Sequence, residues 1–114
     1  MGTEDFIKGA TNLIKRHDKK LEVDAETKFT RYAKACKCKA LKLVLVGLRG
    51  FPDRTILCPE GRVFFIEFKR KGGKVTSGQR NWKSILTRLG FECYVCYTYE
   101  EAKEKLDNFL TFSL

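Results

Sequence analysis

The spacing of apolar residues divides the chain into helical and extended segments. Apolar side chains recur every three or four positions through residues 4–19, which predicts an amphipathic helix. The same spacing predicts a second helix that begins at Asp24 and ends before Lys37. The period then changes to two, which predicts a strand over residues 41–46 and a glycine-containing loop over 47–52.

The rest of the chain completes a mixed pattern. Strands are predicted over 53–58, 63–69 and 91–97, the first two joined by a tight turn. Helices are predicted to begin at Thr76 and Thr98, each with a capping box of Thr and, three residues on, Gln or Glu. The helix after Thr76 is expected to bury a stripe formed by Trp82, Ile85, Leu86 and Leu89. The order of elements predicts an α/β fold, a small mixed sheet with helices packed against it.

Length and composition are typical of one globular domain, predicted to span residues 1–114. The chain is 43% hydrophobic and 12% aromatic, which excludes a disordered protein. Its formal net charge of +9 favours a polyanionic partner, nucleic acid first and an anionic membrane second. A membrane role is not expected, because no apolar run approaches the roughly 20 residues of a spanning helix. The acidic start does not resemble a signal peptide, so a cytoplasmic location is expected.

The five cysteines are an odd number and indicate a reducing environment. A zinc site built from Cys36 and Cys38 with Cys93 and Cys96 is the alternative. It is disfavoured because Cys93 and Cys96 lie three apart in a predicted strand and so face opposite ways. The single histidine, His17, is distant in sequence. Buried apolar thiols are the preferred interpretation.

A carboxylate at the end of an apolar strand indicates chemistry. Glu67 follows the buried run 63–66, and Lys69 shares its face of the sheet while Phe68 points to the other. An ion pair between Glu67 and Lys69 would be the structural explanation. The hairpin, however, brings Asp53 near Glu67 or Lys69, within a residue of register. Two adjacent carboxylates repel unless a cation lies between them. Oxygen ligands, including the backbone carbonyl of Phe68, favour Mg²⁺ or Mn²⁺.

These residues carry a family resemblance. The segment Gly50–Asp53, a hairpin and then Glu67-Phe68-Lys69 resemble the PD-(D/E)xK nuclease signature. The flanking residues narrow the resemblance to the VRR-NUC nucleases of viral and phage type. These flanking residues are 49–54, 65–69, Gln79 and 89–91. The VRR-NUC nucleases are similar in fold to archaeal Holliday-junction resolvases. The resemblance covers residues 24–105 and leaves an extra helix at 1–20. It implies a restriction-endonuclease-like mixed sheet with an αβββαβ core.

The resemblance also implies roles for individual side chains. Asp53 and Glu67 would be metal ligands, and Lys69 would orient or activate the attacking water and stabilise negative charge in the transition state. Gln79 would lie near the site, or would simply complete the capping box of its helix. Glu26 would complete the metal shell, or would be a solvated acid in the first turn of its helix. Glu22 is the substitute if the helical register differs by one turn.

Basic residues surround the proposed site. Residues 61–90 hold eight Lys or Arg against one acid. Contacts of such side chains with phosphates give affinity with little sequence information, so recognition of DNA by shape is expected. The candidate DNA-binding residues are Arg49, Arg54, Arg70, Lys71, Lys74, Arg80 and Lys83. A solvated surface is the alternative, and Arg49 and Arg54 could instead pair with the acids.

Together these features predict a divalent-metal-dependent DNA endonuclease that acts on branched DNA such as a four-way junction in repair, within a host cytoplasm if the source is viral. Cutting both strands needs two active sites, which predicts a homodimer. A flap or single-strand nuclease is the alternative within the same class. A basic DNA-binding module without catalysis is the alternative from another class.

Overall fold

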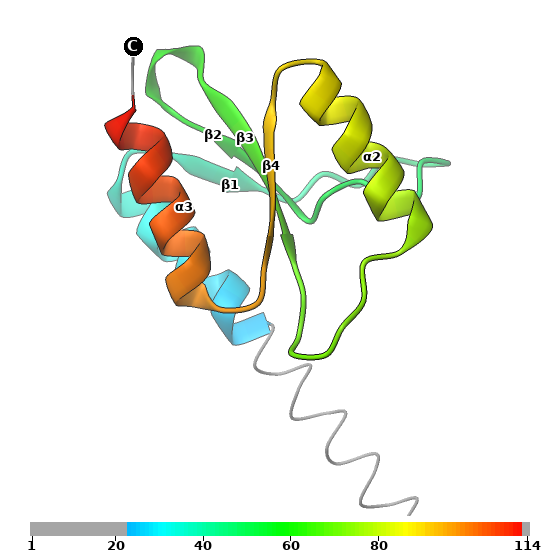
Figure 1. Ribbon diagram of the computed structural model, residues 1–114. Coiled ribbons are helices and arrows are strands. Elements are labelled where there is room, and N and C mark those ends of the chain that lie inside the picture. Colours follow the sequence, from blue (N-terminus) through cyan, green and yellow to red (C-terminus); the bar gives the residue numbers. More distant parts are fainter. Residues whose placement is uncertain (1–22, 113–114) are drawn as a thin grey trace, which may run out of the picture.

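A computed structural model describes residues 23–112 (Figure 1). A helix covers residues 23–35, as the apolar spacing predicts, whereas the helix predicted over 4–19 lies outside the described residues. The other elements, in chain order, are β1 (Lys39–Leu41), β2 (Arg54–Leu57), the 3-10 turn η1 (Pro59–Gly61), β3 (Val63–Phe68), α2 (Ser77–Arg88), β4 (Glu92–Cys96) and α3 (Tyr99–Thr111). The predicted α/β fold is confirmed.

The four strands form one mixed sheet in the order β1-β2-β3-β4. The pairs β1–β2 and β2–β3 are antiparallel, and β3–β4 is parallel. One face of the sheet packs against the helix over 23–35 and α3, and the other face is covered by α2 (Figure 1). Successive residues of a strand point to opposite faces, so each residue of β3 belongs to one of these two layers.

Each layer has its own apolar core. The larger core packs the helix over 23–35 and α3 against the sheet. Its most buried members include Phe29, Ala33, Ile56, Phe64, Ile66, Phe68, Ala102 and Leu106. The smaller core, under α2, contains Phe65, Leu86 and Cys93, with Phe51 and Trp82 packed against it. The rings of Phe51 and Trp82 meet edge to face with centroids 5.1 Å apart. Such pairs add about 0.5–1.5 kcal/mol beyond area burial.

Both predicted helix starts occur, with different capping bonds. At Thr76 the box is complete: its hydroxyl accepts a hydrogen bond from the Gln79 N–H at 3.2 Å, and the Gln79 side-chain oxygen accepts from the Thr76 N–H at 2.9 Å. At Thr98 the hydroxyl accepts from the Glu101 N–H, but the Glu101 carboxylate accepts from the backbone of Tyr97 instead.

Two sequence predictions are wrong in extent. The strand predicted over 41–46 is observed as Lys39–Leu41, and residues 42–46 are exposed and irregular. The β1 register ends at Leu41 opposite Thr55, and β2 itself begins at Arg54, so within the described chain residues 42–46 have no strand to pair with. Leu89, predicted in the buried stripe of α2, is 68% exposed because it is the C-cap residue, where the helix ends.

The cysteines are free thiols, all five lying in the described chain, and four of them are buried. Burial raises the pKa of Cys58 and of Cys96 to about 12, so neither thiol ionises at neutral pH. Within residues 23–112 no three His, Cys, Asp or Glu side chains gather in a way that could hold a metal ion. The interpretation as buried thiols is thus confirmed for Cys38, Cys58, Cys93 and Cys96. No helix among the described residues is both long and apolar enough to cross a bilayer.

Candidate active site

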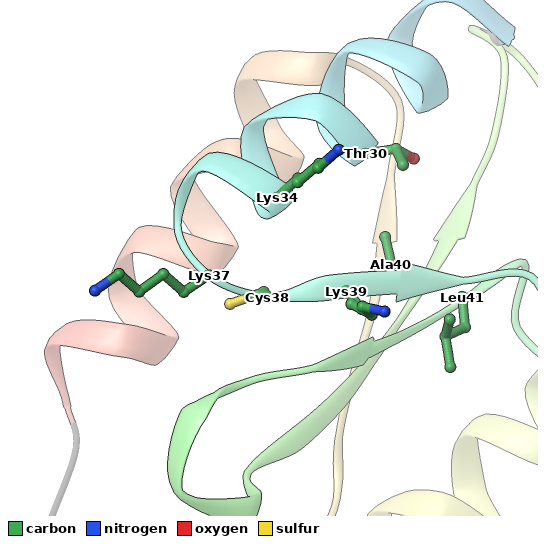
Figure 2. Close-up of a pocket in the computed structure, with 7 residues that line it drawn as sticks. All are labelled: Thr30, Lys34, Lys37, Cys38, Lys39, Ala40 and Leu41. Atoms are coloured by element: carbon green, nitrogen blue, oxygen red, sulfur yellow. The ribbon is translucent and has the colours of Figure 1, made fainter.

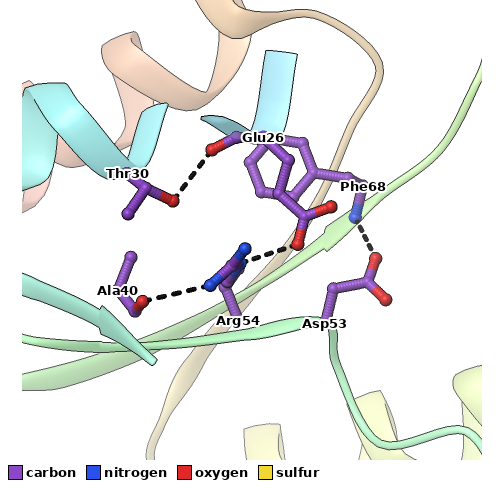
Figure 3. Close-up of polar contacts among 6 residues, drawn as sticks. All are labelled: Glu26, Thr30, Ala40, Asp53, Arg54 and Phe68. Atoms are coloured by element: carbon purple, nitrogen blue, oxygen red, sulfur yellow. Dashed lines mark hydrogen bonds and ion pairs between the residues drawn. The ribbon is translucent and has the colours of Figure 1, made fainter. Parts of the chain in front are cut away.

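The candidate site lies where β2 begins and β3 ends. Arg54 pairs with Ile66 across the two strands, so the preceding residue, Asp53, comes beside Glu67. The Asp53 carboxylate accepts a hydrogen bond from the backbone N–H of Phe68 at 2.8 Å (Figure 3). The hairpin thus brings together the two carboxylates that sequence reasoning singled out.

Glu67 is held in a buried position that disfavours its charge. It is 6% exposed, and its Oε1 accepts a hydrogen bond from the Gln79 side-chain amide at 2.9 Å. Its Oε2 is buried and has no hydrogen-bond partner among residues 23–112. Burial, followed by the negative charge of Asp53, raises the pKa of Glu67 from 4.5 to about 8, although the positive charge of Lys69 acts in the opposite direction.

Lys69 follows directly after β3. Its backbone N–H donates to the carbonyl of Cys96 at 2.9 Å, so the extended pairing with the parallel strand continues through this residue. Because Lys69 is two residues from Glu67, its side chain is on the same face of the sheet. Asp53, Glu67 and Lys69 therefore lie together at one end of the sheet, on the side covered by α2.

Gln79 performs both of the roles considered for it. Its side-chain oxygen accepts from the Thr76 backbone, and its side-chain nitrogen donates to Glu67. These two bonds fix the orientation of the amide group. The N-terminus of α2 is thereby connected directly to the buried carboxylate.

The double role of Gln79 can be tested by comparing two variants. Thr76→Ala removes one capping bond and should lower the free energy of unfolding by about 1 kcal/mol at any pH. Gln79→Glu keeps the oxygen that accepts from Thr76 but replaces the donor to Glu67 with a third acid. We expect Gln79→Glu to lower the free energy of unfolding much more at pH 9 than at pH 6, because Glu67 is protonated at pH 6. Urea unfolding at both pH values measures this, and an equal cost would contradict the contact.

Glu26 does not join the acid pair. It extends from the helix over 23–35, on the opposite side of the sheet from α2, and its carboxylate pairs with Arg54 Nε at 2.6 Å (Figure 3). Arg54 Nη1 also donates to the carbonyl of Ala40 at 3.3 Å. The proposed shell with Glu26 as a third ligand is therefore not assembled, and Arg54 takes the alternative of pairing with an acid. Glu22 lies outside the described residues.

The other candidate DNA-binding residues are exposed around this end of the molecule. They are Arg49 before the site, Arg70, Lys71 and Lys74 in the loop between β3 and α2, and Arg80 and Lys83 on α2. Arg80 also donates to the backbone carbonyl of Val75 at 3.0 Å, which leaves its charge at the surface.

Sequence reasoning missed a close backbone contact that supports the site. Gly50 has φ of +89°, and a Cβ atom there would lie 2.7 Å from the backbone nitrogen of Gln79. The loop that carries Asp53 therefore packs directly against the first turn of α2, next to Gly78. The only signal in the sequence is the pair of glycines at Gly50 and Gly78, which are far apart along the chain.

The side chains present fit a hard divalent cation. Two carboxylates lie side by side, and one of them has a buried oxygen without a hydrogen-bond partner in the described chain. A cation would supply the missing partner for that oxygen and remove the repulsion between the two acids. All of these donors are oxygens, which suits Mg²⁺ or Mn²⁺.

The fold, together with this order of acid, acid and lysine at the ends of two strands, is the one expected of a PD-(D/E)xK domain. Residues 12–99 match the VRR-NUC domain, and the chain belongs to this family of nuclease domains. It is 39% identical over 56 residues to "Putative nuclease p44" of Acyrthosiphon pisum secondary endosymbiont phage 1, covering 49% of this chain and 60% of that protein's length. A solved structure titled VRR_NUC domain superposes with a TM-score of 0.71 at 19% identity, covering 77% of this chain and 96% of the other.

Proposed function

We propose that the protein is a divalent-metal-dependent endonuclease that hydrolyses phosphodiester bonds in branched DNA. The observation that carries this proposal is the buried Glu67 oxygen without a partner in the described chain, beside Asp53 and Lys69. A carboxylate pair that is costly without a cation, next to an ammonium group, is suited to phosphoryl chemistry. Membership of a nuclease family and similarity to a phage protein named as a nuclease support the nuclease activity in this proposal.

Asp53 and Glu67 would hold the Mg²⁺ or Mn²⁺ ion, with the Phe68 carbonyl as a further ligand. When bound, the ion would polarise the phosphate and lower the pKa of a water molecule. Lys69 would orient the attacking water and place its positive charge where negative charge develops on the phosphate.

Hydrogen bonds set the acids in position before any substrate arrives. The Phe68 N–H holds one oxygen of Asp53, and the Gln79 amide holds one oxygen of Glu67. The other oxygen of Glu67 has no partner in the described chain and would be available to the ion. Fixed ligands of this kind reduce the reorganisation needed during the reaction.

The preference for branched DNA rests on charge and symmetry. The exposed basic side chains around the site suit phosphates rather than base edges. Resolution of a four-way junction requires two cuts, so we propose a homodimer with one site in each subunit. A flap or single-strand nuclease would use the same chemistry on a different DNA shape.

Labelled four-way junction, flap, single-stranded and duplex DNA, each incubated with Mg²⁺, Mn²⁺ or EDTA, test this proposal. We expect cleavage only with a divalent ion, and fastest on the junction. Asp53→Asn should remove detectable cleavage, and Lys69→Ala should slow it by about 10²–10³-fold. Glu104→Gln, an exposed acid on α3, is the matched control and should cleave normally.

Two results would overturn the proposal. Cleavage that persists in EDTA or in Asp53→Asn would exclude this metal-ligand pair. Binding of DNA without cleavage under every metal would leave the non-catalytic module as the function.

A further inference from the structure

Two buried side-chain atoms of residues 23–112 have no hydrogen-bond partner, Thr55 Oγ1 and Glu67 Oε2. Each of these residues is 6% exposed. Buried polar groups in proteins nearly always have a partner, which is often an ordered water molecule or an ion. Glu67 is a proposed ligand of the ion, so the question is what the hydroxyl of Thr55 binds.

The strand register places Thr55 on the face of the sheet that α2 covers. Thr55 pairs with Phe65 across β2 and β3, and Phe65 belongs to the apolar core under α2. Directly paired residues share a face, and so do residues two apart in one strand, so Thr55 shares this face with Glu67. The two are diagonal neighbours, whose Cβ atoms are typically less than about 8 Å apart, and one water molecule can bridge such a separation between side-chain oxygens.

The neighbours of Thr55 that the register fixes are apolar. They are Leu41 on β1 and Phe65 on β3. The ring of Phe51 packs against Phe65 with centroids 5.6 Å apart and adds to the apolar surroundings. Because β2 lies between β1 and β3, its backbone groups are used in the two strand ladders. A hydroxyl in this setting is costly unless a water molecule connects it to a polar group, and the acids at the strand ends are such groups.

The pocket of about 470 Å³ beside the helix over 23–35 and β1 contains neither of these atoms (Figure 2). None of its described lining residues belongs to the acid site. The hydroxyl in this lining, that of Thr30, donates to the backbone carbonyl of Glu26 at 2.9 Å. The unpartnered polar atoms of the described chain are therefore a property of the acid site and its surroundings, not of this pocket.

We propose that Thr55 is a positioning residue of the acid site: its hydroxyl holds a water molecule against Glu67 Oε2 and so fixes the orientation of this carboxylate for the cation. The inference rests on the proposed function and extends it. A carboxylate oxygen has two lone-pair sites, so Glu67 Oε2 can accept a hydrogen bond from the water and also bind the ion. The Gln79 amide already holds Oε1 from the side of α2.

Manganese binding in the absence of DNA tests this role. The metal-free full chain is titrated with Mn²⁺, and the free ion is followed by electron paramagnetic resonance. Thr55→Val keeps the shape of the side chain and removes the hydroxyl. We expect its Kd for Mn²⁺ to rise about 10–100-fold, as is typical when a group that orients a metal ligand is lost. Thr55→Ser keeps the hydroxyl and should bind Mn²⁺ nearly as tightly as wild type.

The matched control is Thr87→Val, the same substitution at an exposed position of α2. It should bind Mn²⁺ as wild type does. Unchanged affinity in Thr55→Val would leave Thr55 with a purely structural role and would overturn the proposal. Equal losses of affinity in Thr55→Val and Thr55→Ser would also overturn it, because they would show that packing matters and the hydroxyl does not.

Thermal unfolding in EDTA reports on the water separately from the ion. If the Thr55 hydroxyl holds a water shared with Glu67, valine removes a partner of a buried carboxyl oxygen, and Thr55→Val should melt at a lower temperature than wild type. A hydroxyl without any partner would give the opposite sign, because valine buries another methyl group and is favoured in strands. A melting temperature at or above that of wild type would therefore overturn the proposal.

The proposed function fails separately from the role of Thr55. Wild-type protein that binds Mn²⁺ through Thr55 and Glu67 but never cleaves DNA would keep the positioning residue and lose the nuclease. Cleavage by wild type, with unchanged Mn²⁺ binding in Thr55→Val, would do the reverse. Wild-type protein that binds no Mn²⁺ would overturn both.

Discussion

Replacing Glu67 with glutamine is expected to stabilise the metal-free protein while it abolishes DNA cleavage. Glutamine keeps an oxygen that can accept from Gln79, and its NH₂ group can donate to the adjacent Asp53 carboxylate. The substitution removes a charge that burial and Asp53 both disfavour. It also removes a proposed ligand of the ion, so catalysis and stability should change in opposite directions.

The effect should depend on pH in a defined direction. The pKa of Glu67 is raised from 4.5 to about 8 by folding, so the folded protein holds this proton more tightly than the unfolded chain. The stabilisation is complete below about pH 4.5 and is lost as the pH rises through 8. Each pKa unit corresponds to about 1.4 kcal/mol, so wild type should lose a few kcal/mol over this range and Glu67→Gln should not.

Thermal unfolding in EDTA at pH 5 and pH 9 measures the difference. The melting temperatures should be similar at pH 5, and the variant should be the more stable protein at pH 9. Glu104→Gln is the control for loss of an exposed acid, and its melting temperature should equal that of wild type at both pH values. Adding Mn²⁺ should raise the melting temperature of wild type more than that of Glu67→Gln. A marked destabilisation of the variant at neutral pH would instead support a structural ion pair between Glu67 and Lys69.

The sequence contains what is needed to find the acid pair. A carboxylate that interrupts an apolar strand is visible without a structure, because burial of a charge is costly unless something offsets it. The short turn between β2 and β3 limits the possible registers, so the position of Asp53 opposite Glu67 follows within one residue. The capping box at Thr76 is equally local, since its partners are three residues apart.

Features that depend on distant parts of the chain could not be predicted. The family resemblance implies Glu26 as a metal ligand, but the partner of Glu26 is decided by which face of the sheet its helix covers. The length of β1 was decided by where β2 begins, since a strand needs a partner for its backbone groups. The apolar alternation over 41–46 carries no information about that partner.

Substitution of Gly50 with alanine is expected to destabilise the protein strongly and to damage the site as well. Because Gly50 has a positive φ, an alanine there should lower the free energy of unfolding by about 1–2 kcal/mol. The added methyl group would also lie 2.7 Å from the Gln79 backbone nitrogen, so the first turn of α2 must move. Overpacking of this kind costs about 1–3 kcal/mol more, for a total of roughly 3 kcal/mol. Because Gln79 lies in the first turn of α2, its contact with Glu67 should weaken when that turn moves.

Gly47, in the same loop, allows the conformational cost of an alanine to be measured without a steric clash. It also has a positive φ, of +79°, but no described atom lies within 4 Å of the position of an added Cβ. Gly47→Ala should therefore cost only the conformational part, about 1–2 kcal/mol, and leave cleavage intact. Fluorescence of Trp82, the single tryptophan, reports the packing of Phe51 against α2 and should change only in Gly50→Ala. Equal losses in the two variants would show that the contact between this loop and α2 does not hold the site together.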